Sequence, residues 1–265
     1  KSDHVIAFSQ KALCPSSKTA KKVNRERLGN HHFSPMMPDD KSCPDRIATA
    51  MARLINITGD SQDKIGNLGA AIVALGNAGA STEKEIVDMA LRLGGAGRAA
   101  GLSTPDILGM ASALSSLGIE AEAGGTAFSR VMIDMFEATR NGGEKLKLFA
   151  QVAGMTSAQF KKAFETDAAG AITAFVVGLG KAKDAGINIF PVMDKLELGE
   201  IRVRDALLRA SGAQTMFTDS LNLGKKAWSD NTALTEEAAK RYKTTEQQMV
   251  LLQNNKSIPY NQGGL

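Results

Sequence analysis

The sequence predicts an all-α protein, a multi-helix globular domain punctuated by glycine and proline that follows an irregular N-terminal leader. Helix start signals recur along the chain, and no stretch alternates apolar and polar residues between hairpin turns. Aromatic residues are only 5% of the 265 residues, whereas the chain has 26 glycines and 11 methionines. This composition favours helices that pack closely through small and adaptable side chains.

The first 45 residues differ in composition from the rest. All three histidines, both cysteines and four of the seven prolines precede Asp45, while 25 of the 26 glycines follow Ile47. Residues 1–50 carry nine Lys or Arg and five Asp or Glu, so they hold the whole basic excess. We expect an irregular or disordered basic leader over 1–45, a helical core over 46–255 and a short tail over 256–265. The cluster "KTAKKVNRER" lacks interleaved aromatic residues, which favours a solvated linker over a specific nucleic-acid-binding arm.

The cysteines and histidines do not have the spacing of a metal site. Structural zinc sites pair ligands within short turns, whereas Cys14, the adjacent His31 and His32, and Cys43 are scattered. Two isolated cysteines also give no disulfide framework. We therefore expect no metal and no cofactor.

Helix caps predict the first elements of the core. Asp60 or Ser61 can cap a helix over residues 62–77. Thr82 and Glu85 have the spacing of a capping box, which predicts a helix over 83–93. Thr104, Pro105 and Asp106 combine a capping hydroxyl, a proline at the first helical position and a carboxylate near the positive end of the helix dipole. That helix should reach Leu117 and stop at Gly118.

Three further helices follow. In "TAFSRVMIDMFEATRNGG", residues 126–143, the apolar stripe predicts a core-facing amphipathic helix that ends at Asn141-Gly142; the stripe is Phe128, Val131, Met132, Met135 and Phe136. Thr156 and Gln159 repeat the capping box, with Phe160 and Phe164 on one face. The apolar run over 168–180 is well short of the about 20 residues that span a bilayer, so we expect a buried helix.

Acid-before-base pairs at i, i+4 spacing are typical of solvated helix faces. The pairs are Glu200–Arg204, Asp205–Arg209, Glu236–Lys240 and Glu237–Arg241. They do not form a recognisable acid/base catalytic site.

The glycine-rich stretch "LRLGGAGRAAGLSTPDILG" (91–109) does not match a phosphate-binding loop. Gly95, Gly97 and Gly101 give G-x-G-x-x-x-G, one residue longer than the dinucleotide fingerprint, and the preceding residues are helical rather than a strand. A P-loop is also absent, because Ala182 and Lys226 stand where it needs Ser or Thr. We therefore interpret the glycines as a joint that ends one helix and turns the chain before a cap at Thr104.

Several blocks of the core resemble the shared region of phage tail tape measure proteins. They are "LRLGGAGRAAGLSTPDILGMASALSSLGIEAEAGGTAFSRVM", "GGEKLKLFAQVAGMTSAQFKKAF", "LELGEIRVRDALLRASG" and "KKAWSDNTALTEEAAKRY". "GIEAEAGGTAFSR" (118–130) and "IRVRDAL" (201–207) carry most of the weight. The resemblance covers roughly Asp45 to Asn255. The leader and "KSIPYNQGGL" depart from it, so we expect a fragment or a chain altered at both ends.

The resemblance implies a structural and assembly role. Members of this family occupy the tail lumen, set tail length while tube subunits polymerise, and leave through the tube on infection. The implied partners are the tail tube protein, tail assembly chaperones and tail-tip or baseplate hub proteins, with self-association and transient host membrane contact as further expectations. The implied locations are the virion tail lumen and, during assembly, the host cytoplasm.

The residues expected to matter are those of the helix joints and the most specific blocks. They are Gly94, Gly95, Gly97, Gly101, Thr104, Pro105, Gly118, Glu120, Gly124, Gly125, Arg130, Arg202, Arg204 and Asp205. No catalytic residue is expected, because the core beyond the leader contains neither His nor Cys and no motif joins its carboxylates, lysines and hydroxyls.

Frequent glycine and proline favour a compact helical assembly domain over a continuous helical ruler, because each interior glycine costs a helix about 1 kcal/mol relative to alanine. Two alternatives stay open. One is a membrane-acting helical protein that aids DNA entry, since the small residues of "GNLGAAIVALGNAGA" suit close helix packing in lipid. The other is a helical binding module left from a prophage.

Overall fold

Every regular element over residues 43–236, which the computed structural model describes, is a helix, as the sequence predicts. The elements in chain order are α3 (Cys43–Thr58), η1 (Gln62–Lys64), α4 (Ile65–Ala78), α5 (Glu83–Ala99), α6 (Thr104–Ser116), α7 (Ala121–Asn141), α8 (Gly143–Val152), α9 (Ser157–Thr166), α10 (Ala168–Asp184), α11 (Phe190–Lys195), α12 (Ile201–Ser211) and α13 (Gln214–Asp230).

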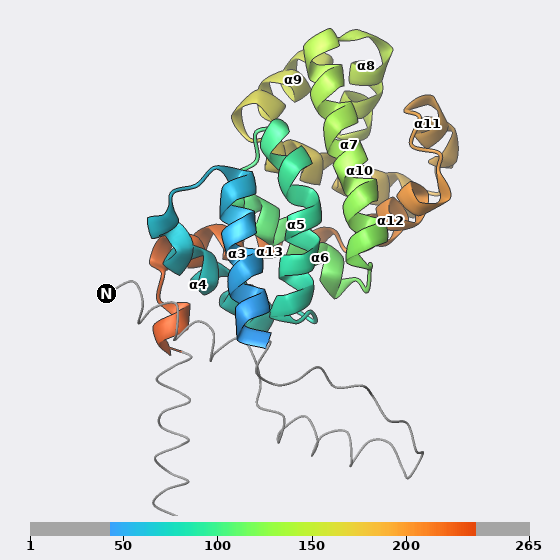
Figure 1. Cartoon of the computed structure of the whole chain (residues 1–265). Helices are drawn as coiled ribbons and strands as arrows, with labels where there is room; N and C mark the ends of the chain where they lie inside the picture. Colours follow the sequence, from blue (N-terminus) through green and yellow to red (C-terminus); the bar gives the residue numbers. More distant parts are fainter. Residues whose placement is uncertain (1–42, 237–265) are drawn as a thin grey trace, which may run out of the picture.

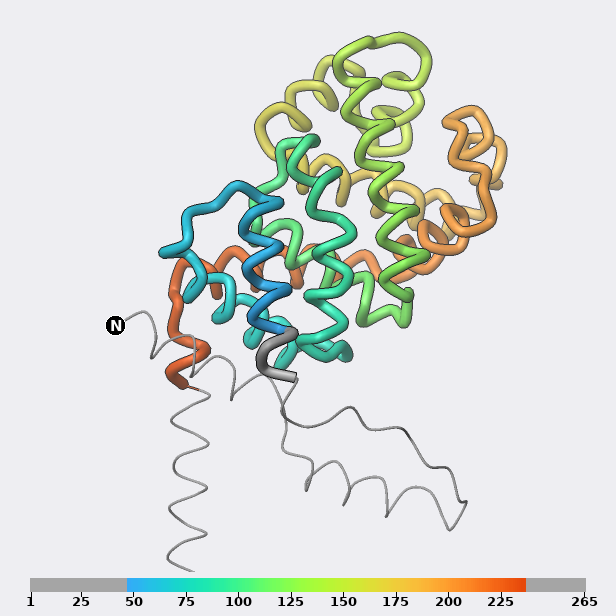
Figure 2. The backbone as a smooth tube through the Cα atoms, in the orientation of Figure 1, coloured from blue at the N-terminus to red at the C-terminus, as the bar shows by residue number. Residues whose placement is uncertain are grey.

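The helices form two lobes that share α7. The first lobe contains α3 to α6 and α13, and the second contains α8 to α12 (Figure 1). α7 packs along α5 at one end and contacts α8, α9 and α12 in the second lobe. The tube in Figure 2 shows the chain returning from the second lobe to the first. There α13 passes behind α3 and α5 and lies against α4 and α6. The last described helix therefore closes the fold onto the first ones.

One hydrophobic core runs through both lobes, from Ile47 to Ala227. Stacked phenylalanines connect its parts. Phe149 lies 6.3 Å from Phe160 and 5.2 Å from Phe175, measured between ring centroids, which fills the second lobe. Phe128 of α7 stacks on Phe217 of α13 at 6.0 Å and joins the second half of the chain to the shared helix. Offset and edge-to-face aromatic pairs of this kind stabilise a core beyond their buried area.

The predicted capping boxes, the amphipathic helix and the buried apolar helix between residues 82 and 184 are confirmed. Both predicted capping boxes are present, at Thr82 with Glu85 and at Thr156 with Gln159. Four of the five residues in the predicted stripe of α7 are buried, and Phe136 packs against the core at its edge. α7 ends at Asn141, and Gly142 follows with φ +71°. The apolar run over 168–180 is the buried part of α10.

The start of the second helix differs from the prediction. Residues 62–64 form a short 3₁₀ turn, and the α-helix begins only at Ile65. Ser61 precedes the turn without a capping hydrogen bond to the backbone. The Asp60 carboxylate instead accepts hydrogen bonds from the hydroxyls of Thr58 and Thr104, so it ties α3 to α6 rather than capping its own helix.

α6 and α13 cross in backbone contact. A Cβ atom at Gly109 would lie 2.8 Å from Leu221 Cα and 2.9 Å from the Ser220 carbonyl oxygen. A Cβ atom at Gly224 would lie 2.9 Å from the Pro105 carbonyl oxygen. Separations under 3.0 Å leave no room for a side chain, so glycine at both positions is what allows the two helices to meet.

Some predictions fall outside the described residues. These are the leader up to residue 42, with Cys14, His31 and His32, the ion pairs Glu236–Lys240 and Glu237–Arg241, and the tail. α3 begins at Cys43, two residues before the compositional boundary at Asp45. In the described part of the chain, no helix has the length and apolar character needed to cross a bilayer.

Candidate binding cleft and charged corner

The joint between α5 and α6 contains fewer residues than the sequence predicts, because α5 continues to Ala99 and α6 begins at Thr104. Gly94, Gly95 and Gly97 do not end a helix but lie inside α5. The prediction failed because two of these glycines serve packing. A Cβ atom would lie 2.9 Å from Ile57 Cγ2 at Gly94, and 2.9 Å from Ile107 Cγ1 at Gly97. Gly95 has open space around it, and no contact explains it.

The turn itself is made at Gly101, whose φ of +88° is in the region that favours glycine. The cap that follows is Ser103 rather than Thr104, because α6 begins at Thr104 and Ser103 has the extended conformation of an N-cap. Ser103 and Asp106 form a capping box, in which the Ser103 amide donates to Asp106 Oδ2 at 3.1 Å. Pro105 is the second residue of α6, one position later than predicted.

The α6–α7 joint places the next predicted residues. Gly118 turns the chain with φ +68°, and Glu120 is the N-cap of α7 without a side-chain capping bond. Gly124 and Gly125 are buried in the first turns of α7. A side chain on Gly124 would collide with Ile119, and a Cβ at Gly125 would lie 2.5 Å from Arg92 Cβ. These two glycines let α7 lie close to α5 and to its own entry loop.

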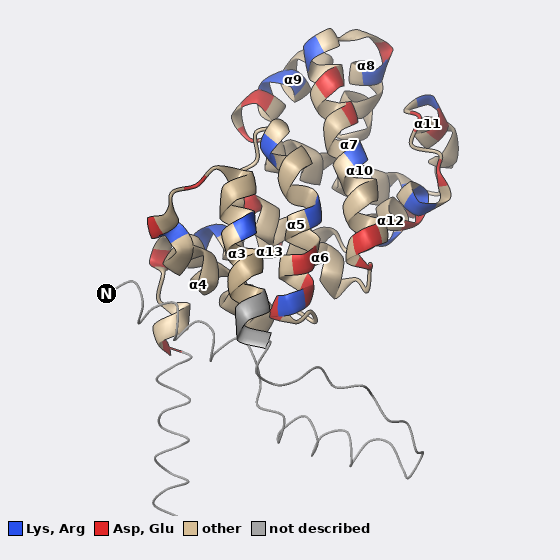
Figure 3. Ribbon diagram, in the orientation of Figure 1, with Lys and Arg blue, Asp and Glu red and all other residues tan. Residues whose placement is uncertain are grey.

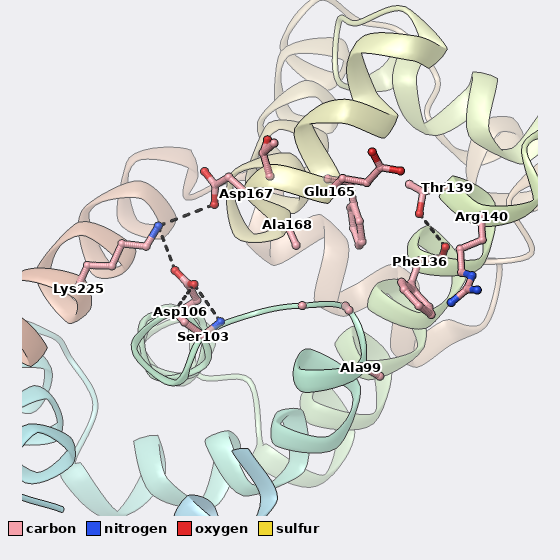
Figure 4. A pocket seen from close by; sticks show the side chains of 14 residues that line it. Ala99, Ser103, Asp106, Phe136, Thr139, Arg140, Glu165, Asp167, Ala168 and Lys225 are labelled. Atoms are coloured by element: carbon pink, nitrogen blue, oxygen red, sulfur yellow. Dashed lines mark hydrogen bonds and ion pairs between the residues drawn. The ribbon is translucent and has the colours of Figure 1, made fainter. Parts of the chain in front are cut away.

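An open cleft of about 780 Å³ lies where the two lobes meet. Its walls come from the α5–α6 joint, the end of α7, the α9–α10 joint and α13. Figure 4 shows Lys225 on one side, with Asp106 and Asp167 turned toward it, and Arg140 on the other side. The lining therefore combines charges of both signs with apolar side chains such as Phe136 and Phe164.

Lys225 is the electrostatic centre of this cleft. Its Nζ lies 3.1 Å from Asp106 Oδ1 and 3.8 Å from Asp167 Oδ1, so one ammonium joins α13 to α6 and to the start of α10. Partial burial would lower the pKa of Lys225, but the hydrogen bond and charge of Asp106 and the charge of Asp167 outweigh it, so the pKa is raised. Asp106 is only 7% exposed, and the ammonium supplies the partner for its second oxygen.

The far wall is lined by Arg140, whose guanidinium carbon lies 5.5 Å from the centroid of the Phe136 ring. Glu165 lies beside it in the lining. The cleft can thus receive a polar segment of another molecule through carboxylate and cationic contacts. Among residues 43–236, no group of three or more His, Cys, Asp or Glu side chains is arranged to hold a metal ion.

A second group of charges joins α7 to the turn before α12. Arg130 pairs with Glu200, and its Nη2 donates to the Glu197 carbonyl oxygen at 3.0 Å. Lys145 of α8 pairs with the Glu197 carboxylate at 2.8 Å. This hydrogen bond and the charge of Lys145, aided by Arg130, hold the pKa of Glu197 below its ordinary value. We call these interactions the corner clasp.

The α12 residues do not pair as their spacing predicts. Glu200 and Arg204 are not partners, because Glu200 is the extended N-cap residue and its carboxylate points to Arg130. Arg204 pairs instead with Asp194 and lies over the Phe190 ring. The predicted pair of Asp205 and Arg209 is confirmed, with 2.9 Å between Oδ2 and Nε. Arg202 is exposed on the same helix. Figure 3 shows charges of both signs mixed over α11 and α12.

Sequence reasoning missed Asp167, Lys225, Lys145 and Glu197. Asp167 could have been found, because an Asp directly before an apolar helical run is an N-cap signal, and its side chain does accept from the Gly170 amide. Lys225 and Lys145 leave no local signal, since their partners lie far away in the chain.

Comparison with known proteins identifies the family. The profile of phage-related minor tail proteins matches residues 39–190, more than half of the chain. The chain belongs to this family. A structural role in a phage tail follows, and this minor tail protein is a component of the virion tail. The match spans α3 to α10 and ends at Phe190, the first residue of α11. Searches of curated proteins and of solved structures found no match.

Proposed function

We propose that this minor tail protein is a tape-measure-like core segment, which occupies the tail lumen and helps tube subunits to assemble. The observation that carries the proposal is the family match over 39–190, read together with the block "GIEAEAGGTAFSR" that resembles tape measure proteins. In the structure this block is the α6–α7 joint and the first part of α7, the helix that both lobes share.

We propose further that this segment is an assembly domain and not the ruler. A ruler needs a long element of fixed rise, and at about 1.5 Å per residue the 21-residue α7 spans only about 30 Å. The chain then turns back, and α13 packs on α4 and α6. A folded unit of this kind suits docking to tube subunits, assembly chaperones or tail-tip proteins, for which the inter-lobe cleft offers a concave surface with both charged and apolar side chains.

No catalysis is part of the proposal. Three ionisable groups of the cleft have structural roles, because Asp106 caps α6 and Lys225 bridges it to Asp167. An enzyme would need a nucleophile and a base held for a substrate, and our proposal assigns no such role to the residues of the cleft. We propose that the protein acts through binding alone.

The test is to produce tails with and without the region 43–236, removed in frame, and to measure their number and length by electron microscopy. We expect tails to be lost or irregular. Tails of normal form that shorten in proportion to the residues removed would contradict the assembly-domain reading, because that is how a ruler behaves.

A matched biochemical test is co-purification of the full chain with the tail tube protein of the same phage. Tube protein that assembles into tubes of one length without the chain, and never co-purifies with it, would overturn the tape-measure proposal. It would leave the tail family assignment intact.

A further inference from the structure

The segment 187–200, which contains α11 and which we call the corner strap, differs from the helices around it in how it is held. Four of its side chains point inward and are buried, namely Ile189, Met193, Leu196 and Leu198. Its outward apolar side chains are unusually open, with Ile187 60% and Phe190 43% exposed. α11 has only six residues, too few to be a stable helix without support.

The backbone of the strap is bonded locally. The amides of Met193, Leu196, Glu197 and Leu198 donate to carbonyls at positions 189, 192, 194 and 193 of the same segment. Only its two ends share backbone hydrogen bonds with the lobes, because the Ile187 amide donates to the Ala182 carbonyl of α10 and the Glu200 carbonyl accepts from the Arg204 amide of α12. The part between these ends can move as a unit without breaking backbone hydrogen bonds of the helical lobes.

Both ends of the strap have backbone conformations suited to a hinge. Gly186, just before it, has φ +75°. Near its other end Glu197 has φ +62°, a left-handed conformation that costs a non-glycine residue energy and persists only where contacts hold it. The contacts that hold it are the helix-ending hydrogen bonds of the Glu197 and Leu198 amides and the corner clasp, in which Arg130 binds the Glu197 carbonyl and Lys145 binds its carboxylate.

The strap edge is held by ion pairs between solvent-facing side chains, namely those of the corner clasp and the pair of Arg204 with Asp194. In the pair of Lys145 and Glu197 the side chains are 37% and 68% exposed, and the pair of Arg130 and Glu200 is equally open. Such pairs are weakened by dissolved salt, because the Debye length falls from about 10 Å at 0.1 M to about 3 Å at 1 M. The buried side chains of Ile189, Met193, Leu196 and Leu198, which we call the apolar plug, do not share this dependence on salt.

We propose that the corner strap is a salt-sensitive element that opens as a unit, hinged at Gly186 and at the turn around Glu197. The plug keeps the closed state dominant, and the clasp sets how often the strap opens. Opening uncovers the four buried apolar side chains, and Ile201, the first residue of α12, is already 85% exposed in the closed form. The open form thus presents an apolar surface that the closed form hides. The proposal does not depend on the role of the protein in the tail.

Amide hydrogen exchange of the full chain, followed by mass spectrometry at about 0.02 M and about 1 M salt, tests this proposal. We expect exchange in peptides covering 190–200 to be roughly threefold faster at high salt, with α5 and α6 unchanged. Equal exchange at both salt concentrations, or acceleration of all helices together, would overturn it.

Variants separate the clasp from general stability. Lys145→Ala should give the fast exchange of 190–200 already at low salt, and Lys145→Arg should restore slow exchange. Lys84→Ala is the control, because it removes another solvent-facing ion pair, with Asp88, on α5. If Lys84→Ala accelerates the strap as much as Lys145→Ala does, the clasp has no specific part in holding it.

Discussion

Where α6 crosses α13, two glycines bring helix backbones into contact, whereas α11 is held at its rim by ion pairs that face solvent. The first contact depends on shape alone, since Gly109 and Gly224 leave no room for a Cβ atom. The second depends on charges that water and salt can screen. The difference teaches that the first lobe is fixed by close backbone packing at the α6–α13 crossing. The corner strap, in contrast, has an edge whose interactions depend on the solvent.

The largest expected effect is at the crossing. Gly109→Ala should lower the free energy of unfolding by about 1–3 kcal/mol, because the new methyl group forces the backbones of α6 and α13 apart. Gly95→Ala is the matched control, since Gly95 is also inside a helix but has nothing within 4 Å. It should raise the free energy of unfolding by up to about 1 kcal/mol. Urea titrations followed by circular dichroism measure both, and two changes of the same sign would refute the close-contact account.

A smaller effect is expected where the lobes meet. Lys225→Met should cost about 1–2 kcal/mol, because it leaves the Asp106 carboxylate buried without its cation. The adjacent Lys226 is exposed and serves as the control, so Lys226→Met should be close to neutral. Thermal unfolding of the two variants gives the comparison. Equal stability of the two would mean that the bridge does not hold the lobes together.

The local part of this fold could be predicted from the sequence and the tertiary part could not. Capping boxes at Thr82 and Thr156 depend on residues three positions apart, so their pattern is visible in the chain. A glycine is ambiguous, because Gly101 turns the backbone while Gly97 makes room for Ile107, and only the neighbouring helix decides which. A tertiary contact also decides the cap of α6. Ser103 is the N-cap residue where Thr104 was expected, and the Thr104 hydroxyl donates to Asp60 instead.

The candidate site shows the same limit more strongly. Arg130 was expected to matter, but its partner Glu200 is 70 residues away, and Lys145 and Glu197 are 52 residues apart. Spacing rules for helices reach only three or four residues. They therefore predicted the pair of Asp205 and Arg209 and misassigned Arg204. The tape-measure role, the partners and the absence of catalysis stay predictions.

Acid should weaken the corner, whereas the backbone contact at Gly109 and Gly224 contains no titratable group. The pKa of Glu197 is lowered in the folded state by the hydrogen bond and charge of Lys145 and by Arg130. A carboxylate with a lowered folded pKa contributes stability above its unfolded pKa and loses it as pH falls through the folded pKa. Two further carboxylates, those of Asp134 and Glu200, lie near Glu197 because both pair with Arg130.

The measurement is hydrogen exchange of 190–200, corrected for intrinsic rates, as pH falls from neutral to below about 4. The corrected exchange of the strap should rise relative to that of α6, and Glu197→Gln should remove most of this pH dependence. A strap that follows α6 at every pH would contradict the role assigned to the clasp.

The smallest effect is expected at Asp134, which lies beside the clasp on α7. Burial raises the pKa of Asp134, and the charges of Lys145 and Arg130 lower it by less, so the ionised form is mildly unfavourable in the folded protein. Its Oδ2 is 3.7 Å from Arg130 Nε, too far for a good hydrogen bond. Asp134→Asn should therefore change stability by less than about 0.5 kcal/mol at neutral pH, in the stabilising direction.

The sign of that change can be checked with pH. A folded pKa above the unfolded value means that the wild-type carboxyl penalises folding only where it is ionised, at higher pH. The advantage of Asp134→Asn should thus be present at pH 7 and vanish near pH 3, where the wild-type carboxyl is protonated and resembles the amide. A variant that is instead clearly destabilised at pH 7 would show that Arg130 needs the Asp134 charge to stay aimed at Glu200, which would extend the corner clasp by one residue into α7.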